Sequence, residues 1–133
     1  MIAIDTSALM AILLAEPASV SVRQAIEQAD GLCMSAATLA EAMIVAERRR
    51  VGAEMAELVE GLGIEIVALT ASDARVVAGA CRDWGKGRHP AGLNFGDCFA
   101  YALAVQRDCP LLHVGVDFSA TDARPAIPAP RSP

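Results

Sequence analysis

The sequence predicts an α/β fold in which helices cover both faces of a central parallel sheet, a three-layer α/β/α sandwich. The chain has 133 residues, enough for one compact domain with a substantial core. It is 54% hydrophobic but only 4% aromatic, so aliphatic side chains must fill the space between helices and a buried sheet. Short apolar runs alternate with segments of helical spacing, which indicates βαβ units.

The N-terminal third gives the first of these units. Residues 2–4 form a short apolar run that predicts a buried strand, and an apolar helical stretch covers residues 8–15. Pro17 ends that helix, and residues 19–29 predict a second one. A turn then leads into a strand at residues 32–34.

Helix and strand alternate again in the middle of the chain. Residues 38–50 show helical spacing and end in three arginines, which suit a helix C-terminus, and Gly52 breaks this helix. A helix over residues 53–62 precedes an apolar strand at residues 64–67, and a further helix is expected over residues 72–84.

The last third contains a basic loop at residues 85–90, a helix that starts at Asn94 and a final strand at residues 111–114. We expect one domain over residues 1–124. Residues 125–133 are rich in proline and predict a mobile C-terminal tail.

Composition narrows the classes of protein to consider. No apolar run approaches the roughly 20 residues of a membrane span, and no basic residue precedes Arg23 as a secretory signal would require. We therefore expect a cytoplasmic protein without a membrane partner. The cysteines lie far apart without metal-ligand spacing and predict reduced, mostly buried thiols: Cys33, Cys81, Cys98 and Cys109.

The charge is unevenly distributed. The formal net charge is −5, which taken alone disfavours a nucleic-acid partner. Residues 75–88, however, carry four basic side chains against the single acid Asp83. A local basic strip therefore exists in an acidic chain.

Four acids lie just beyond a predicted strand or in the first turn of a predicted helix: Asp5, Glu41, Asp97 and Asp117. Each has an ordinary structural explanation. Asp5 suits an N-cap, and Glu41 forms a capping-box pattern with Thr38. Asp97 follows Asn94 by three residues at a helix start, and Asp117 suits a turn.

Their common placement favours a functional explanation. A parallel sheet gathers such positions at one edge, the carboxyl ends of its strands. Several carboxylates at one edge repel each other unless a divalent cation neutralises them. An all-oxygen ligand set suits Mg²⁺ or Mn²⁺ rather than zinc.

These residues stand within longer motifs. They are Asp5-Thr6-Ser7-Ala8-Leu9, then Glu41, then residues 93–102 (Leu-Asn-Phe-Gly-Asp-Cys-Phe-Ala-Tyr-Ala), then residues 111–112 and 115–118. In order and spacing they resemble the motifs of VapC-type PIN domains, over residues 2 to about 122. The first and third motifs together are highly specific.

The resemblance implies a PIN fold and an Mg²⁺- or Mn²⁺-dependent endoribonuclease, the toxin of a toxin–antitoxin pair. Its expected products carry a 5′-phosphate and a 3′-hydroxyl. It implies a VapB-type antitoxin as partner, a homodimer, and RNA as substrate, with transfer or ribosomal RNA as candidates. Asp5, Glu41 and Asp97 match the family's metal-binding acids, whereas Asp117 matches the fourth more loosely and Asp122 is the alternative.

Other residues carry secondary expectations. Thr6, Ser7 and Asn94 either orient the acids or cap helices. Arg82, Lys86 and Arg88 either contact RNA phosphates or form a solvated surface.

The histidines and aromatic residues carry further expectations. His113 is expected to be structural, and His89 is expected either to be solvated or to contact RNA. Tyr101 and Phe99 are expected to belong to the core. Trp84 is expected beside the basic loop, where it stacks on a base or lines a partner groove.

The sequence leaves two alternatives to a ribonuclease to consider. An aspartyl-phosphate enzyme also gathers acids around Mg²⁺, but Ser7 stands where a second Asp is needed and the only lysine, Lys86, lies far from the last strand. A PIN domain that binds RNA or a partner without cleaving is the main alternative.

Overall fold

The computed structural model describes residues 1–127, and within them six helices surround a four-stranded sheet. The elements follow one another as β1 (Ile2–Ile4), α1 (Thr6–Leu13), α2 (Ser19–Gln28), β2 (Leu32–Ser35), α3 (Ala36–Arg48), α4 (Gly52–Gly61), β3 (Glu65–Val67), α5 (Ala71–Trp84), α6 (Phe95–Gln106) and β4 (Leu111–Leu112). The predicted alternation of strands and helices is confirmed.

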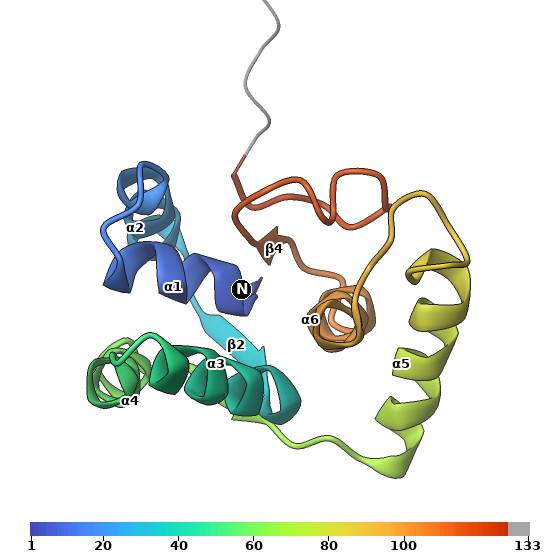
Figure 1. Ribbon diagram of the computed structural model, residues 1–133, viewed down its shortest axis with the longest axis horizontal. Coiled ribbons are helices and arrows are strands. Elements are labelled where there is room, and N and C mark those ends of the chain that lie inside the picture. Colours follow the sequence, from blue (N-terminus) through green and yellow to red (C-terminus); the bar gives the residue numbers. More distant parts are fainter. Residues whose placement is uncertain (128–133) are drawn as a thin grey trace, which may run out of the picture.

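The sheet is parallel throughout and has the order β3-β2-β1-β4. Strand β1 is central, since Ala3 pairs with Cys33 of β2 on one side and with Leu111 of β4 on the other. The chain therefore builds outward from β1 to β2 and β3, and then crosses back to place β4 on the opposite side of β1. Figure 1 shows β2 and β4 between the two groups of helices.

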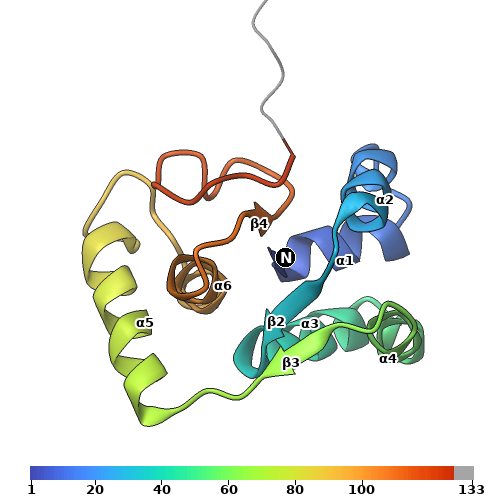
Figure 2. The ribbon, with the colours of Figure 1, turned by 180° about the vertical axis from the view of Figure 1, so that it is seen from behind.

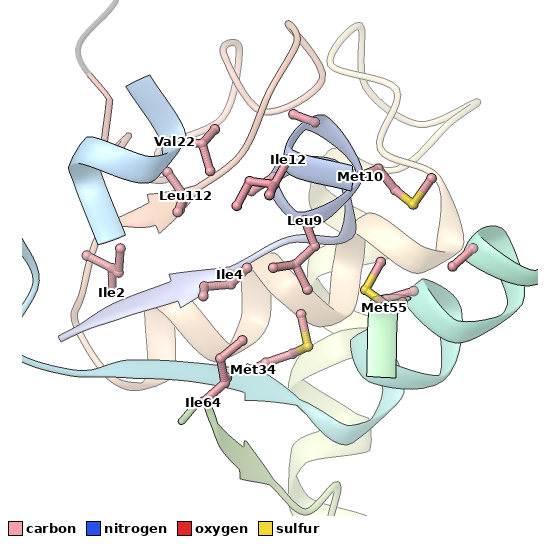
Figure 3. Close-up of a cluster of buried hydrophobic side chains, with 14 residues drawn as sticks. Ile2, Ile4, Leu9, Met10, Ile12, Val22, Met34, Met55, Ile64 and Leu112 are labelled. Atoms are coloured by element: carbon pink, nitrogen blue, oxygen red, sulfur yellow. The ribbon is translucent and has the colours of Figure 1, made fainter. Parts of the chain in front are cut away.

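Successive residues of each strand face opposite sides of the sheet, as a pleated backbone requires. Ile2 and Ile4 pack with α1–α4 in one core cluster, whereas Ala3 between them packs with α5 and α6 in the other. Figure 3 shows the first cluster, where Ile4, Leu9 and Met34 meet between the sheet and the helices. The predicted α/β/α sandwich is thus confirmed, with α1–α4 on one face and α5 and α6 on the other (Figures 1 and 2).

The helix that carries Glu41 begins earlier than predicted. We expected it to start at Thr38, but it starts at Ala36 because the side chain of Ser35 accepts a hydrogen bond from the Ala37 amide, 3.2 Å away. Thr38 lies inside the helix and is 1% exposed. Gly52 was expected to break this helix. The helix ends at Arg48, and Gly52 is the first residue of α4.

The start of the expected C-terminal tail contacts the rest of the domain. The Leu111 amide donates to the carbonyl oxygen of Arg124 over 2.8 Å, and the Ala126 amide donates to that of Leu111 over 2.9 Å. Ala126 and Ile127 pack against the core. The first three residues of the expected tail therefore lie alongside β4, while residues 128–133 lie outside the described residues.

Two expectations from composition can be compared with residues 1–127. No helix in that range combines the length and the apolar character that a bilayer crossing needs. All the cysteines are free thiols, and Cys33, Cys98 and Cys109 are buried whereas Cys81 is exposed.

Candidate metal centre

The candidate centre lies at the carboxyl edge of the sheet, where β1 and β4 are neighbours. At this point the strand order reverses, and such a switch point leaves a crevice beyond the strand ends in open α/β sheets. Asp5 follows β1 directly, and its backbone amide donates to the Leu112 carbonyl oxygen over 3.0 Å. The segment that carries Asp117 leaves the end of β4 beside it.

Asp5 is 4% exposed and serves as the N-cap of α1. Its Oδ2 atom accepts hydrogen bonds from the Ser7 hydroxyl (2.6 Å) and the Ser7 amide (3.1 Å). No donor among residues 1–127 reaches its buried Oδ1 atom. Burial raises the pKa of Asp5, the hydrogen bonds from Ser7 and Thr6 oppose this, and the charge of Asp117 raises it further.

Ser7 connects the two strands at the switch point. While its hydroxyl donates to Asp5, its Oγ accepts a hydrogen bond from the Val114 amide over 3.0 Å. Val114 was expected to extend the last strand, but β4 ends at Leu112 and the Val114 amide turns to this side chain instead. Ser7 therefore fixes Asp5 relative to the loop that carries Asp117.

Glu41 lies in the second turn of α3 and does not cap that helix, because Ser35 does. The predicted capping box of Thr38 and Glu41 is therefore wrong. The Glu41 Oε1 atom instead accepts a hydrogen bond of 2.7 Å from the Thr6 hydroxyl. This contact joins α3 to the residue that follows Asp5.

Gly96 makes room for the Glu41 carboxylate. A Cβ atom at position 96 would lie 1.8 Å from Glu41 Oε2 and 2.6 Å from its carboxyl carbon, far inside van der Waals contact. Only glycine therefore lets the first turn of α6 approach Glu41 this closely.

Asp97 is in the first turn of α6 and is 7% exposed. Asn94 and Asp97 form the predicted capping box: the Asn94 Oδ1 atom accepts from the Asp97 amide (2.9 Å), and the Asp97 Oδ2 atom accepts from the Asn94 amide (3.1 Å). The pKa of Asp97 is nevertheless raised to about 6. Burial is the main cause, and the charges of Asp5, Asp117 and Glu41 add to it.

The two candidates for the fourth acid lie in different surroundings. Asp117 is exposed, in a turn where the Ser119 amide donates to the Val116 carbonyl oxygen over 3.1 Å, and its charge raises the pKa values of both Asp5 and Asp97. Asp122 accepts a hydrogen bond from the Tyr101 hydroxyl. Asp117 thus acts electrostatically on Asp5 and Asp97, whereas Asp122 is hydrogen-bonded to a buried residue of α6.

The donor set suits a hard divalent cation. Among residues 1–127, no three Asp, Glu, His or Cys side chains enclose a metal position as they stand. Asp5, Glu41 and Asp97 are each hydrogen-bonded to a donor of the chain. Glu41 is half-buried and Asp117 exposed, so both can rotate. An unpartnered buried Asp5 oxygen and carboxylates that raise each other's pKa are the features that Mg²⁺ or Mn²⁺ would satisfy.

The remaining sequence-derived candidates lie elsewhere. Arg82, Lys86 and Arg88 line a cavity between α5 and α6. The indole nitrogen of Trp84 donates to the Tyr101 hydroxyl over 2.9 Å, and the Trp84 ring lies edge-on to His89 at 4.8 Å. Trp84 is therefore part of the packing between these helices rather than a free stacking platform.

The two histidines are half-buried. His89 Nδ1 accepts from the Ala91 amide over 2.9 Å. His113 lies against Phe118, with ring centroids 5.0 Å apart, and burial lowers its pKa. Neither is held by any of the four acids, which agrees with a site that works without histidine.

Sequence reasoning missed two residues of this region. Gly96 was named only as part of a motif, although a glycine beside an acid in a first helical turn is a signal of close approach. Phe95 was treated likewise, but it is 73% exposed at the start of α6. The only sequence feature that pointed to a role for Phe95 was its position two residues before Asp97.

Comparison with known proteins agrees with this arrangement. The family model described as PIN domain matches residues 2–124. The ribonuclease VapC42 of Mycobacterium tuberculosis is 40% identical over 127 residues, which cover 92% of this chain and 97% of the relative. Ribonuclease VapC30 of the same organism is 42% identical over 129 residues, covering 94% and 98%. The chain therefore belongs to the PIN-domain family and, more narrowly, to its VapC ribonucleases.

Solved structures show the same fold at low sequence identity. The sarcin-ricin loop cleaving toxin VapC20 of Mycobacterium tuberculosis matches with a TM-score of 0.72 at 20% identity, covering 94% of this chain and all of that one. A toxin–antitoxin complex from Klebsiella pneumoniae matches with a TM-score of 0.68 at 17% identity, covering 92% and 93%. VapBC2 from Rickettsia felis, bound to a DNA fragment from its promoter, also gives 0.68, at 13% identity over 94% and 96%.

Proposed function

We propose that this protein is a divalent-metal-dependent endoribonuclease that acts as the toxin of a toxin–antitoxin pair. The observation that carries the proposal is that acids from three other segments, Asp5, Glu41 and Asp117, act electrostatically on Asp97, while a buried oxygen of Asp5 has no donor among residues 1–127. Membership of the VapC ribonucleases supports the same activity.

Asp5, Glu41, Asp97 and Asp117 are the residues that hold Mg²⁺ or Mn²⁺ in this proposal, and we assign the fourth place to Asp117 rather than Asp122. When bound, the cation supplies Lewis-acid chemistry: it neutralises phosphate charge and activates water for in-line attack at phosphorus. The products are a 5′-phosphate and a 3′-hydroxyl.

The chain's own contribution is to hold the carboxylates in place. Ser7 orients Asp5, and Thr6 orients Glu41 through the hydrogen bonds described above. Asn94 holds Asp97 at the start of α6, where the positive end of the helix dipole favours a carboxylate. Second-layer contacts of this kind typically contribute 10- to 100-fold to metal affinity or activity.

Cleavage of end-labelled RNA tests the proposal. The wild-type protein should cut RNA with Mg²⁺ or Mn²⁺ and not with EDTA, and Asp97→Asn should lose activity by at least about 100-fold. Asp122→Asn is the matched control and should retain activity. If the wild-type protein binds RNA but never cuts it, the alternative of a non-cleaving PIN domain holds.

The partner in this proposal is a VapB-type antitoxin that covers the acids, and the toxin itself forms a homodimer. Relatives of known structure include toxin–antitoxin assemblies. An arginine is the side chain best suited to reach a carboxylate cluster. Replacing the antitoxin's arginines with alanine should restore RNA cleavage by the complex, and light scattering of the toxin alone would measure the dimer.

A further inference from the structure

A cavity of about 620 Å³ lies between α5 and α6, next to the start of α6. Its volume falls within the range of about 300–1,000 Å³ that is typical of ligand sites. The floor is apolar and includes Val77, Ala78 and Phe99. In Figure 2, α5 lies next to α6, which is seen almost end-on.

Phe95 forms one wall of this cavity and is 73% exposed. Phe99, one helical turn further on, supports it edge-on, with ring centroids 4.9 Å apart and an interplanar angle of 86°. Phe99 thus contacts the ring on one side and leaves most of it exposed. An exposed aromatic ring is suited to stacking on a planar ligand.

Three cations line the same cavity: Arg82, Lys86 and Arg88. Arg82 makes a loose contact of 3.5 Å with its neighbour Asp83, both side chains being largely exposed. No carboxylate among residues 1–127 pairs with Lys86 or Arg88. In a chain with a net charge of −5, this local excess of positive charge favours a polyanionic ligand.

The cavity and the candidate metal centre share the first turn of α6. Phe95 is the first residue of that helix, and Asp97 lies two residues further on. The acids repel a phosphate backbone, so a strand that reaches them needs cations nearby to hold it. The apolar floor with a cationic rim supplies what a protein groove offers to unpaired nucleotides.

We propose that this cavity is a subsite for single-stranded RNA, in which Phe95 stacks on an unpaired base beside the cleavage point while Lys86 and Arg88 contact phosphates. The inference rests on the proposed ribonuclease function and adds a residue that positions the substrate. A protein occupant, either an antitoxin segment or a second copy of the chain, is the competing outcome.

Binding of fluorescein-labelled single-stranded RNA octamers in EDTA, which prevents cleavage, tests Phe95. Phe95→Leu should weaken binding about tenfold because a base stack is lost, and Phe95→Tyr should stay within about threefold of the wild type. Val20→Ala, which alters an exposed apolar residue of α2, is the control and should change nothing. An octamer made of abasic nucleotides should no longer distinguish Phe95→Leu from the wild type.

The cations are tested through the salt dependence of the same binding. Lys86→Gln with Arg88→Gln should lower the slope of log affinity against log salt by about 1.4, or about 0.7 for each phosphate contact. Arg23→Gln, an exposed cation on α2, should leave the slope unchanged.

The outcomes distinguish a failure of the proposed subsite from a failure of the proposed ribonuclease function. If the wild type cleaves RNA with Mg²⁺ but Phe95→Leu binds and cleaves equally well, the subsite is wrong and the function stands. If Phe95→Leu instead changes only dimerisation or antitoxin binding, the cavity is a protein interface. If the wild type neither binds nor cleaves RNA, both proposals fail.

Discussion

Three consecutive residues at the end of β1 have distinct roles in the site. Asp5 supplies a buried carboxylate, Thr6 donates to Glu41, and Ser7 donates to Asp5 while accepting from the Val114 amide. From the sequence, Thr6 and Ser7 could be either helix caps or residues that orient the acids. The cap of α1 is Asp5 itself, which leaves both hydroxyls available to orient acids.

Removing the Thr6 hydroxyl should reduce cleavage without unfolding the protein. Thr6→Val keeps the shape of the side chain but leaves Glu41 without its 2.7 Å donor, so we expect RNA cleavage to fall 10- to 100-fold. Thr6→Ser retains the hydroxyl and should stay within a few-fold of the wild type. Equal cleavage rates for Thr6→Val and the wild type would contradict the role given to Thr6.

Gly96→Ala should separate stability from activity. The new Cβ would overlap the Glu41 carboxylate and turn that flexible side chain away, so cleavage should fall at least about tenfold. Stability should hold or rise, because alanine is favoured over glycine inside a helix by up to about 1 kcal/mol.

Gly61→Ala provides the matched control for Gly96→Ala. Position 61 is also helical, and a Cβ there meets no atom within 4 Å, so thermal stability should respond without loss of cleavage. Melting curves and initial cleavage rates measured on both variants check the pair. Full activity in Gly96→Ala would show that the position of Glu41 is irrelevant.

At the scale of elements, Asp97 in the first turn of α6 caps the helix although its negative charge is unfavourable in this buried, acidic position. Asp97 accepts the Asn94 amide as a capping residue should, yet burial and three neighbouring acids raise its pKa to about 6. The capping pattern was readable from the sequence at this helix. At α3 the same pattern failed, because Ser35 lies three residues upstream of Thr38 and local spacing does not reveal which hydroxyl caps.

Asp97 should make the metal-free protein less stable as pH rises. Its folded-state pKa, about 6, lies above the ordinary value of 3.8, so the fold favours the neutral acid. The stability that this preference contributes is fully present below about pH 4 and is lost as pH rises through 6. The whole effect amounts to at most about 3 kcal/mol.

Urea unfolding in EDTA measures this loss. Asp97→Asn keeps an oxygen for the Asn94 amide but removes the charge, so it should match the wild type near pH 4 and exceed its stability at pH 7. A variant that is less stable than the wild type at pH 7 would contradict the raised pKa of Asp97.

At the scale of the whole molecule, the order of strands brings the site together. Alternation of apolar runs predicted the sandwich and the edge at which Asp5 and Asp97 lie. It did not give the order β3-β2-β1-β4, which makes β1 and β4 neighbours and so brings the segment after β4, which carries Asp117, to the same end of the sheet as Asp5. Pairing between distant strands depends on packing across the whole sheet, which local patterns do not encode.

The same limit explains the C-terminal segment. Proline content predicted a tail from residue 125, but Leu111 at the sheet edge has hydrogen-bonding groups that residues 124 and 126 satisfy. The unpaired N–H and C=O groups of an edge strand can form hydrogen bonds with an adjacent backbone whatever its side chains are. Amino-acid composition does not indicate where such an edge lies.

Titration calorimetry with Mn²⁺ tests the central claim, that these acids act as one cation site. The wild type should bind Mn²⁺. Binding should be weakened at least tenfold by each of three substitutions, Asp5→Asn, Asp97→Asn and Asp117→Asn. Asp122→Asn should leave the affinity unchanged. If the wild type takes up no Mn²⁺, or if Asp122→Asn weakens binding as much as Asp117→Asn does, the account of this site is contradicted.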